Sequence, residues 1–168
     1  MLLRLARVDD AEAIRDIYNY EVSHGTNTFD LVPRTLEEQR QWVVRHQGAH
    51  PAVVAVRDTD DSEERPVVVG FGVLSPYRDR PAYPTTVEDS VYVDRRHRGR
   101  RVGQAVLEEL LRLAAAQGFH TVVARISGHN EASIRLHERC GFTVVGVERE
   151  VGRKHRQWLD VVELQRML

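Results

Sequence analysis

The sequence contains little cysteine, little lysine and no long apolar run. Its single cysteine, Cys140, excludes an intramolecular disulfide and any cysteine-rich zinc site. No stretch approaches the roughly 20 apolar residues of a membrane-spanning helix. Arg4 and Arg7 interrupt the apolar start, so no signal peptide is predicted. We therefore expect a protein of the reducing cytoplasm with no membrane attachment.

Lysine is nearly absent, whereas arginine is abundant and locally dense. Of the 24 basic residues only Lys154 is a lysine, and five arginines crowd into residues 95–101. The formal net charge is nevertheless −1. A nucleic-acid-binding protein usually spreads its basic residues over a whole face. We therefore expect no nucleic-acid partner, and a single anion site at the arginine-rich segment.

The length and composition favour one folded domain over residues 1–168. An apolar fraction of 42% is enough for a buried core. The chain shows no internal repeat, linker or low-complexity segment. Its eight histidines are scattered and cysteine is scarce, so we expect no metal site.

Apolar residues alternate, or recur at helical spacing, through most of the chain. Thr35 and Glu38 form a capping box, Asn130 can cap another helix, and Gly118 and Gly141 are helix stop signals. The pattern predicts one α/β (α+β) domain with a mixed, mostly antiparallel, twisted sheet flanked by helices, in the order β α α β β β α β α β β. The predicted strands cover 2–5, 52–56, 67–74, 85–93, 121–126, 143–151 and 157–164, with a solvated acidic loop at 57–66, and the predicted helices cover 14–22, 35–45, 102–117 and 130–140.

A strand, a turn rich in glycine and arginine, and an amphipathic helix follow one another from Ser90 to Gly118. A helix N-terminus offers unpaired N–H groups and partial positive charge, and glycine lets a phosphate approach the backbone. The hexamer Arg100-Arg-Val-Gly-Gln-Ala105 matches R/Q-x-x-G-x-G/A and resembles the acetyl-CoA pyrophosphate site of the GNAT superfamily of N-acetyltransferases. The Rossmann fingerprint and the GK[ST] phosphate loop are both absent. The resemblance implies acetyl-CoA contacts at Val91, Tyr92, Val93, Arg98, Gly99, Arg100, Arg101, Val102, Gly103, Gln104 and Ala105.

A second motif of that superfamily matches residues 130–142. The segment resembles N-x-x-(S/A)-x-x-L-Y-x-x-x-G-F, and by this resemblance Asn130 and Ser133 join the acetyl-CoA site at the pantetheine arm. Most members have a tyrosine that protonates the leaving CoA thiolate, whereas this chain has His137. An imidazole with an ordinary pKa of about 6.5 donates or accepts a proton near neutrality. The alternative is a helix histidine that is hydrogen-bonded beside the cofactor.

Several separate segments resemble one group within the superfamily, the phosphinothricin N-acetyltransferases. That group includes relatives that acetylate methionine sulfoximine and methionine sulfone, and it also has histidine at the position of His137. The resemblance covers nearly the whole chain. The matching segments are Tyr18-Asn-Tyr20 with Asn27-Thr-Phe29, Tyr77-Arg-Asp-Arg-Pro-Ala-Tyr83, Glu88-Asp-Ser-Val-Tyr-Val93, Leu136-His-Glu138 and Gly152-Arg-Lys-His-Arg-Gln-Trp-Leu-Asp160.

Two residues are candidates for proton transfer. The ammonium of an amino-acid substrate must lose a proton before its nitrogen attacks a thioester, so a base is needed. Glu88 is our candidate base, and strand alternation places Glu88, Ser90 and Tyr92 on one face. By resemblance to the group, His137 acts together with Glu88 as an acid or base. The alternative for Glu88 is an exposed strand-end glutamate.

The acceptor substrate needs a cation for its carboxylate. Arg78 and Arg80 are the candidates, because an arginine fork binds a carboxylate through two charge-assisted hydrogen bonds. Phe29, Tyr83 and Trp158 are candidate pocket walls, although an aromatic side chain more often packs in a core.

The resemblance implies acetyl transfer from acetyl-CoA to the α-amine of a small glutamate- or methionine-like compound. It also implies a homodimer. A peptide or protein N-terminal acetyltransferase is the alternative within the superfamily. A nucleic-acid-binding module at residues 95–101 is the alternative from a different class.

Overall fold

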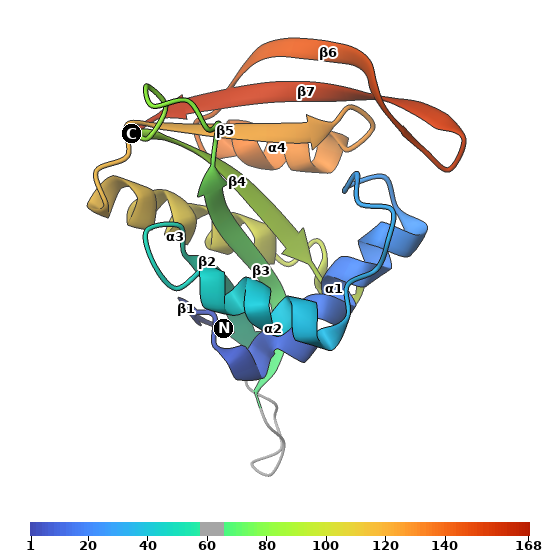
Figure 1. Ribbon diagram of the computed structural model, residues 1–168, viewed down its shortest axis with the longest axis vertical. Coiled ribbons are helices and arrows are strands. Elements are labelled where there is room, and N and C mark those ends of the chain that lie inside the picture. The colour runs from blue at the N-terminus through green and yellow to red at the C-terminus, as the bar shows by residue number, and fades with distance from the viewer. Residues whose placement is uncertain (58–65) are drawn as a thin grey trace.

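The computed structural model describes residues 1–57 and 66–168 (Figure 1). Its elements follow the predicted order, and the last two strands run further than predicted, to Lys154 and Met167. Residues 58–65, which make up most of the predicted acidic loop at 57–66, lie outside the described residues. The strands are β1 (Leu2–Leu5), β2 (Ala52–Arg57), β3 (Val67–Pro76), β4 (Thr86–Val93), β5 (Thr121–Ser127), β6 (Thr143–Lys154) and β7 (Gln157–Met167). The helices are α1 (Ala11–His24), α2 (Leu36–Arg45), α3 (Val102–Ala116) and α4 (Glu131–Arg139).

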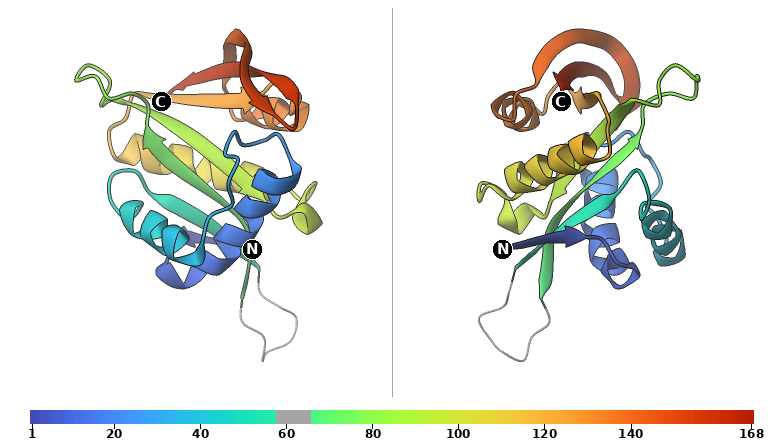
Figure 2. Two further views of the ribbon diagram at one scale, coloured as in Figure 1. Left: turned by 45° about the vertical axis from the view of Figure 1, so that its right-hand side comes forward. Right: turned by 90° about the vertical axis from the view of Figure 1, so that its left-hand side faces the viewer.

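The strands form one mixed, twisted sheet in the order β1-β2-β3-β4-β5-β7-β6 (Figure 2). Neighbouring strands are antiparallel except β4 and β5, which are parallel. Parallel neighbours need a crossover connection, and α3 provides it. The expected mostly antiparallel sheet is thus confirmed.

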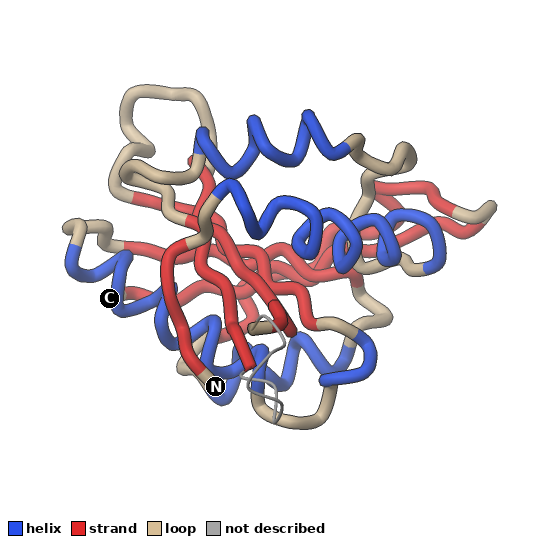
Figure 3. Tube along the Cα trace, turned by 90° about the horizontal axis from the view of Figure 1, so that it is seen from below, coloured by secondary structure: helices blue, strands red, loops and turns tan. Residues whose placement is uncertain are grey.

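Helices cover both sides of the sheet (Figure 3). On one side Ile14 of α1 and Val43 of α2 are buried in a cluster with Phe71 of β3. On the other side Leu107 and Leu110 of α3 are buried in a separate cluster, against which α4 also packs. The helical spacing of apolar residues explains this arrangement, because each helix buries one stripe and leaves the rest in water.

Local sequence signals determine where two of the helices begin. The Thr35 hydroxyl accepts a hydrogen bond from the Glu38 N–H at 3.2 Å, and the Glu38 carboxylate accepts one from the Thr35 N–H at 2.7 Å. Before α4, the Asn130 side chain accepts from the Ser133 N–H at 3.1 Å. Both predicted caps are confirmed.

The parallel strands β4 and β5 separate before they end. Their pairing runs only from Thr86 with Thr121 to Asp89 with Ala124. Beyond that point β4 continues to Val93 beside β3 alone, while β5 continues beside β7. Backbone groups on the facing edges of the two strands are therefore left without a strand partner, and the gap between the strands positions the site.

Candidate active site

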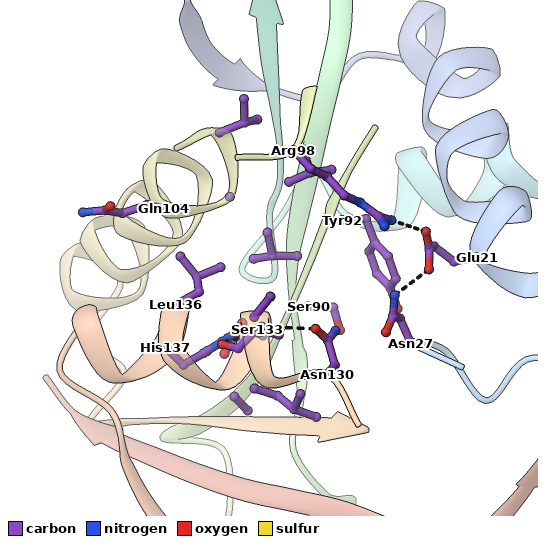
Figure 4. A pocket seen from close by; sticks show the side chains of 18 of the residues that line it. Glu21, Asn27, Ser90, Tyr92, Arg98, Gln104, Asn130, Ser133, Leu136 and His137 are labelled. Carbon is purple, nitrogen blue, oxygen red and sulfur yellow. Dashed lines mark hydrogen bonds and ion pairs between the residues drawn. The ribbon is translucent and has the colours of Figure 1, made fainter. Parts of the chain in front are cut away.

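A pocket of about 390 Å³ lies where β4 and β5 diverge (Figure 4). The start of α3 and the inner face of α4 close one side, and the end of α1 closes the other. Predicted acetyl-CoA residues that line it are Val91, Tyr92, Val93, Arg98, Gly99, Arg101, Val102, Gly103, Gln104, Asn130 and Ser133. Lining residues that the sequence analysis did not single out for the site include Glu21, Asn27, Asp89, Arg125 and Ser127.

Two predicted acetyl-CoA residues, Arg100 and Ala105, do not line the pocket. Arg100 is exposed. The Ala105 N–H already donates to the Arg101 carbonyl at 3.1 Å as part of the first turn of α3. The motif fixes the spacing of its six residues. It does not show which of their N–H groups already form hydrogen bonds within the helix, so the sequence could not distinguish Arg100 and Ala105 from the residues that line the pocket.

The turn before α3 is built by two residues in the left-handed region, Gly99 at φ 73° and Arg101 at φ 61°. No described side chain caps α3, so the first N–H groups of the helix remain free. Gly103 allows close packing here, since an added Cβ would lie 3.2 Å from Leu136 and 3.4 Å from Val93. The turn therefore presents free N–H groups and arginines to one end of the pocket, as expected for an anion site.

Two arginines of the segment before α3, Arg96 and Arg98, have acidic partners. Arg98 forms an ion pair with the buried carboxylate of Glu21, which also accepts from the Asn27 side chain at 2.6 Å (Figure 4). Arg96 is exposed and pairs with Asp94 at 2.8 Å. Arg98 thus connects the turn to the end of α1, a contact between residues 77 positions apart that no local pattern reports.

His137 is buried and its partner is Asp89. The two side chains are 3.0 Å apart, from Nε2 to Oδ2, and only 3% of His137 is exposed. Its other ring nitrogen, Nδ1, lies 2.7 Å from the Ser133 carbonyl. Burial lowers the pKa of His137, but the hydrogen bond and charge of Asp89 outweigh it, so the pKa is raised. The ring is therefore held between two acceptors and favours its charged form.

Glu88 lies on the other face of β4 from His137. Tyr92 packs on Tyr18 of α1, whereas Val91 and Val93 pack toward α3. By strand alternation Glu88 shares the face of Tyr92, as predicted, and Asp89 faces α3 and α4. Glu88 does not line the pocket directly, and burial raises its pKa although Arg125 opposes this. The structure thus brings His137 to Asp89 and does not bring it to Glu88.

The predicted acceptor-binding residues lie outside the pocket. Arg78 and Arg80 are exposed on the segment between β3 and β4, and the Arg78 guanidinium lies 4.8 Å from the Tyr77 ring. Tyr83 contacts the same ring edge-on, with centroids 5.4 Å apart. This segment follows Ser75, which pairs with Glu88, so it lies at the Glu88 end of β4.

Two further aromatic candidates lie near the β6–β7 hairpin. Phe29 is 41% exposed, and its ring packs on the backbone of Gly152 in β6. Trp158 is 56% exposed under the Arg153 guanidinium. Both side chains are therefore partly exposed and do not belong to the core.

Three buried polar atoms of pocket residues have no hydrogen-bond partner within the described chain. They are Oδ1 of Asp89, Nδ1 of His97 and Oγ of Ser127. Buried polar groups are nearly always hydrogen-bonded, so these atoms point to a ligand with hydrogen-bonding groups of its own.

Metal ligands do not cluster in the part of the chain that the structure describes. His46 and His50 are four residues apart, but α2 ends at Arg45, so the two do not share a helical face. Among the helices within 1–57 and 66–168, none is long and apolar enough to cross a membrane.

Comparison with known proteins gives consistent matches. The model of the acetyltransferase (GNAT) family matches residues 14–142. Phosphinothricin N-acetyltransferase of Streptomyces coelicolor is 40% identical over 95% of this chain and 92% of its own. The L-methionine sulfoximine/L-methionine sulfone acetyltransferase of Salmonella typhimurium is 35% identical over 100% and 95%. The crystal structure of a phosphinothricin acetyltransferase from Sinorhizobium meliloti in complex with AcCoA superposes with a TM-score of 0.92 at 36% identity, covering 99% of this chain and 88% of the other.

Proposed function

The chain belongs to the GNAT family of acetyltransferases, and from this premise we propose that it acetylates the α-amino group of a small amino-acid-like compound of the phosphinothricin, methionine sulfoximine or methionine sulfone type. The observation that carries the proposal is the pocket between β4 and β5, with an anion-binding turn at one end and Glu88 beyond the other. In this reaction acetyl-CoA supplies a thioester, from which the acetyl group passes to the amine nitrogen while CoA leaves as the thiol.

The pocket residues fit acetyl-CoA. Its phosphates would meet the free N–H groups at the start of α3 together with Arg98 and Arg101. Its pantetheine amides match the unpartnered polar atoms of Asp89 and Ser127, and the Asn130 side chain lines the same wall. The β4 backbone within 91–93 has no partner strand on the β5 side, and it would supply the oxyanion donors.

Glu88 is the proposed base for the acceptor ammonium. Its carboxylate lies on the α1 face of β4, whereas the α3 face carries Asp89 and His137. A carboxyl group whose pKa is raised by burial accepts a proton more readily than an ordinary glutamate. We propose that His137, kept charged by Asp89, acts on the thiol side of the pocket.

The acceptor is proposed to bind at the Glu88 end of β4. Arg78 and Arg80 lie on the segment that enters this end, and we propose that they bind the acceptor carboxylate. Tyr83 and Phe29 would form apolar walls. The acceptor would then approach from the α1 face of β4, opposite to α3 and α4, so the two substrates would meet near Ser90.

We propose further that the active protein is a cytoplasmic homodimer without metal or nucleic acid. The exposed apolar side chains of the edge strand β6 support self-association, among them Val144, Val145 and Val147. The formal net charge of −1 and the acidic partners of Arg96 and Arg98 oppose a nucleic-acid surface.

The proposal is tested by measuring CoA thiol release with a panel of amines. We expect turnover with phosphinothricin, methionine sulfoximine or methionine sulfone, and little with a peptide amine. Turnover of the peptide alone would support the N-terminal acetyltransferase alternative instead. Titration with DNA at rising salt completes the test, because steeply salt-dependent DNA binding without CoA affinity would contradict an enzyme.

A further inference from the structure

Lys154, the only lysine of the chain, is buried at the end of β6 with 3% of its surface exposed. A buried ammonium is stable only when its N–H groups meet acceptors, because desolvation of a charge is costly. Its Nζ donates to two backbone carbonyls, that of Thr28 at 2.8 Å and that of Glu21 at 3.3 Å. Burial lowers the pKa of this ammonium, and the charges of Asp30 and Glu21 oppose the shift.

Both carbonyls belong to segments that carry pocket residues. Glu21 is in the last turns of α1, and its carboxylate lines the pocket. Asn27, the neighbour of Thr28, lines the pocket and donates to that carboxylate. One ammonium group therefore binds the end of α1 and the loop after it at the same time.

The hairpin makes a second, apolar contact with this loop. A Cβ on Gly152 would lie between 2.2 and 2.9 Å from three atoms of the Phe29 ring, so the ring packs directly on the β6 backbone. Figure 1 shows the tip of the β6–β7 hairpin beside the loop that follows α1. Lys154 and Gly152 thus hold residues 25–30 against the hairpin.

The loop is also held from the side of α1. The Tyr18 hydroxyl lies 2.9 Å from the Thr28 hydroxyl and donates to Asp30 at 2.6 Å. These bonds join the loop to its own helix but not to the sheet. Among the described side chains, Lys154 makes the polar link from the loop to the β6–β7 hairpin.

We propose that Lys154 is a positioning residue that holds residues 25–30, together with Glu21 and Asn27, on the acceptor side of the active site. It therefore sets the affinity for the acceptor amine and has a much smaller effect on the affinity for acetyl-CoA. This assignment rests on the proposed acetyltransferase function. We assign residues 25–30 to the acceptor because this loop lies on the α1 face of β4, the face that Glu88 and Tyr92 share.

The test compares Lys154→Met, which removes the donors but keeps the length, with Arg149→Met, an exposed control on the same strand. In Lys154→Met we expect the KM for the acceptor to rise about tenfold, as for the loss of a charge-assisted hydrogen bond. The KM for acetyl-CoA should stay within about twofold. Arg149→Met should match the parent protein. Equal rises in both KM values, or an unchanged acceptor KM, would overturn the assignment.

Hydrogen exchange of the ligand-free protein provides a readout that needs no activity. Amides of residues 25–30 should exchange faster in Lys154→Met than in Arg149→Met, and unchanged exchange would overturn the positioning role of Lys154. If no acceptor reacts with the parent protein, the proposed function fails, and hydrogen exchange still tests whether Lys154 holds residues 25–30 in place. If Lys154→Met does not fold, Lys154→Arg takes its place, and the acceptor KM alone is expected to change.

Discussion

Glu88 and Asp89 are adjacent carboxylates with opposite surroundings. Asp89 is 4% exposed, and one of its oxygens contacts the His137 ring while the other has no described partner. Glu88 is half-buried on the α1 face, where burial raises its pKa and Arg125 opposes the rise. One step along the strand thus turns the first carboxylate to the α1 face of the sheet and the second to the side of α4.

Replacing Glu88 with Gln should lower kcat by about 100-fold or more, the usual range for loss of a general base. Because its pKa is raised, Glu88 keeps its proton to a higher pH than an ordinary glutamate, and a base must be deprotonated. Activity of the parent protein should therefore fall as the pH drops through a midpoint above 4.5. A pH–rate profile measures this, alongside calorimetry of CoA binding.

In Glu88→Gln the acidic limb of the profile should disappear while CoA affinity is unchanged. Glu12→Gln, an exposed change at the start of α1, is the matched control and should behave like the parent protein. A Glu88→Gln profile that superimposes on that of the parent would contradict the assignment of the base.

Among the secondary-structure elements, α4 is attached to the sheet by one charged pair. The helix packs lightly, through Ile134 and Leu136 against the α3 cluster, and His137 reaches across to Asp89 of β4. Since the side chains of both partners are at least 96% buried, their attraction is weakly screened, and loss of either one leaves a buried polar group without compensation. The pair therefore also fixes the wall of the pocket that carries Asn130 and Ser133.

The stability that is lost when Asp89 loses its charge should depend on pH. The folded pKa of His137 is raised above its ordinary value of 6.5, so the protonated ring stabilises the fold fully below pH 6.5. That contribution is lost as the pH rises through the folded pKa. Asp89→Asn should lower the free energy of unfolding by about 2 kcal/mol on the acidic side of 6.5, and by less in alkaline solution.

Urea denaturation on both sides of neutrality measures this difference. Asp9→Asn, an exposed change, is the control and should show little effect at either pH. An equal loss of stability at both pH values would mean that Asp89 contributes packing and hydrogen bonding but no charge pairing with His137.

At the scale of the whole molecule, the basic charge is concentrated where a polyanion would bind and is balanced elsewhere. Arg95, whose guanidinium lies 4.6 Å from the Tyr20 ring, belongs to the same segment as Arg96 and Arg98. Asp94 and Glu21 form ion pairs with the last two. The ion pair of Arg98 with Glu21 joins the turn before α3 to the end of α1.

The exposed valines of β6 lead to a prediction about assembly. β6 is an edge strand, and Val144, Val145, Val147 and Val151 are each about half exposed. Exposed apolar edge strands favour pairing with a second copy, most often about a two-fold axis. Light scattering should give a mass about twice 19.3 kDa, and Val147→Glu should shift the protein toward the monomer. A monomeric parent protein at micromolar concentration would contradict the homodimer.

The element order and the turn before α3 could be predicted from the sequence because both depend on local information. Hydrophobic periodicity determines which face of a helix or strand is buried, and caps such as Thr35 and Asn130 act within one turn. The hexamer 100–105 marks a helix start whose N–H groups are free for geometric reasons alone. These signals need only a few neighbouring residues.

Only the tertiary structure decided which distant side chains meet. By resemblance, His137 and Glu88 are predicted to act together, and the fold pairs the His137 ring with Asp89, because alternation turns adjacent strand residues to opposite faces and α4 covers just one of them. Glu21 escaped notice as one polar residue on an amphipathic helix, yet it receives Arg98 and Lys154 from far along the chain. For the same reason, no role could be assigned from the sequence to Lys154, the single lysine of the chain. Its partners are backbone carbonyls, which every residue has and which only folding brings within reach.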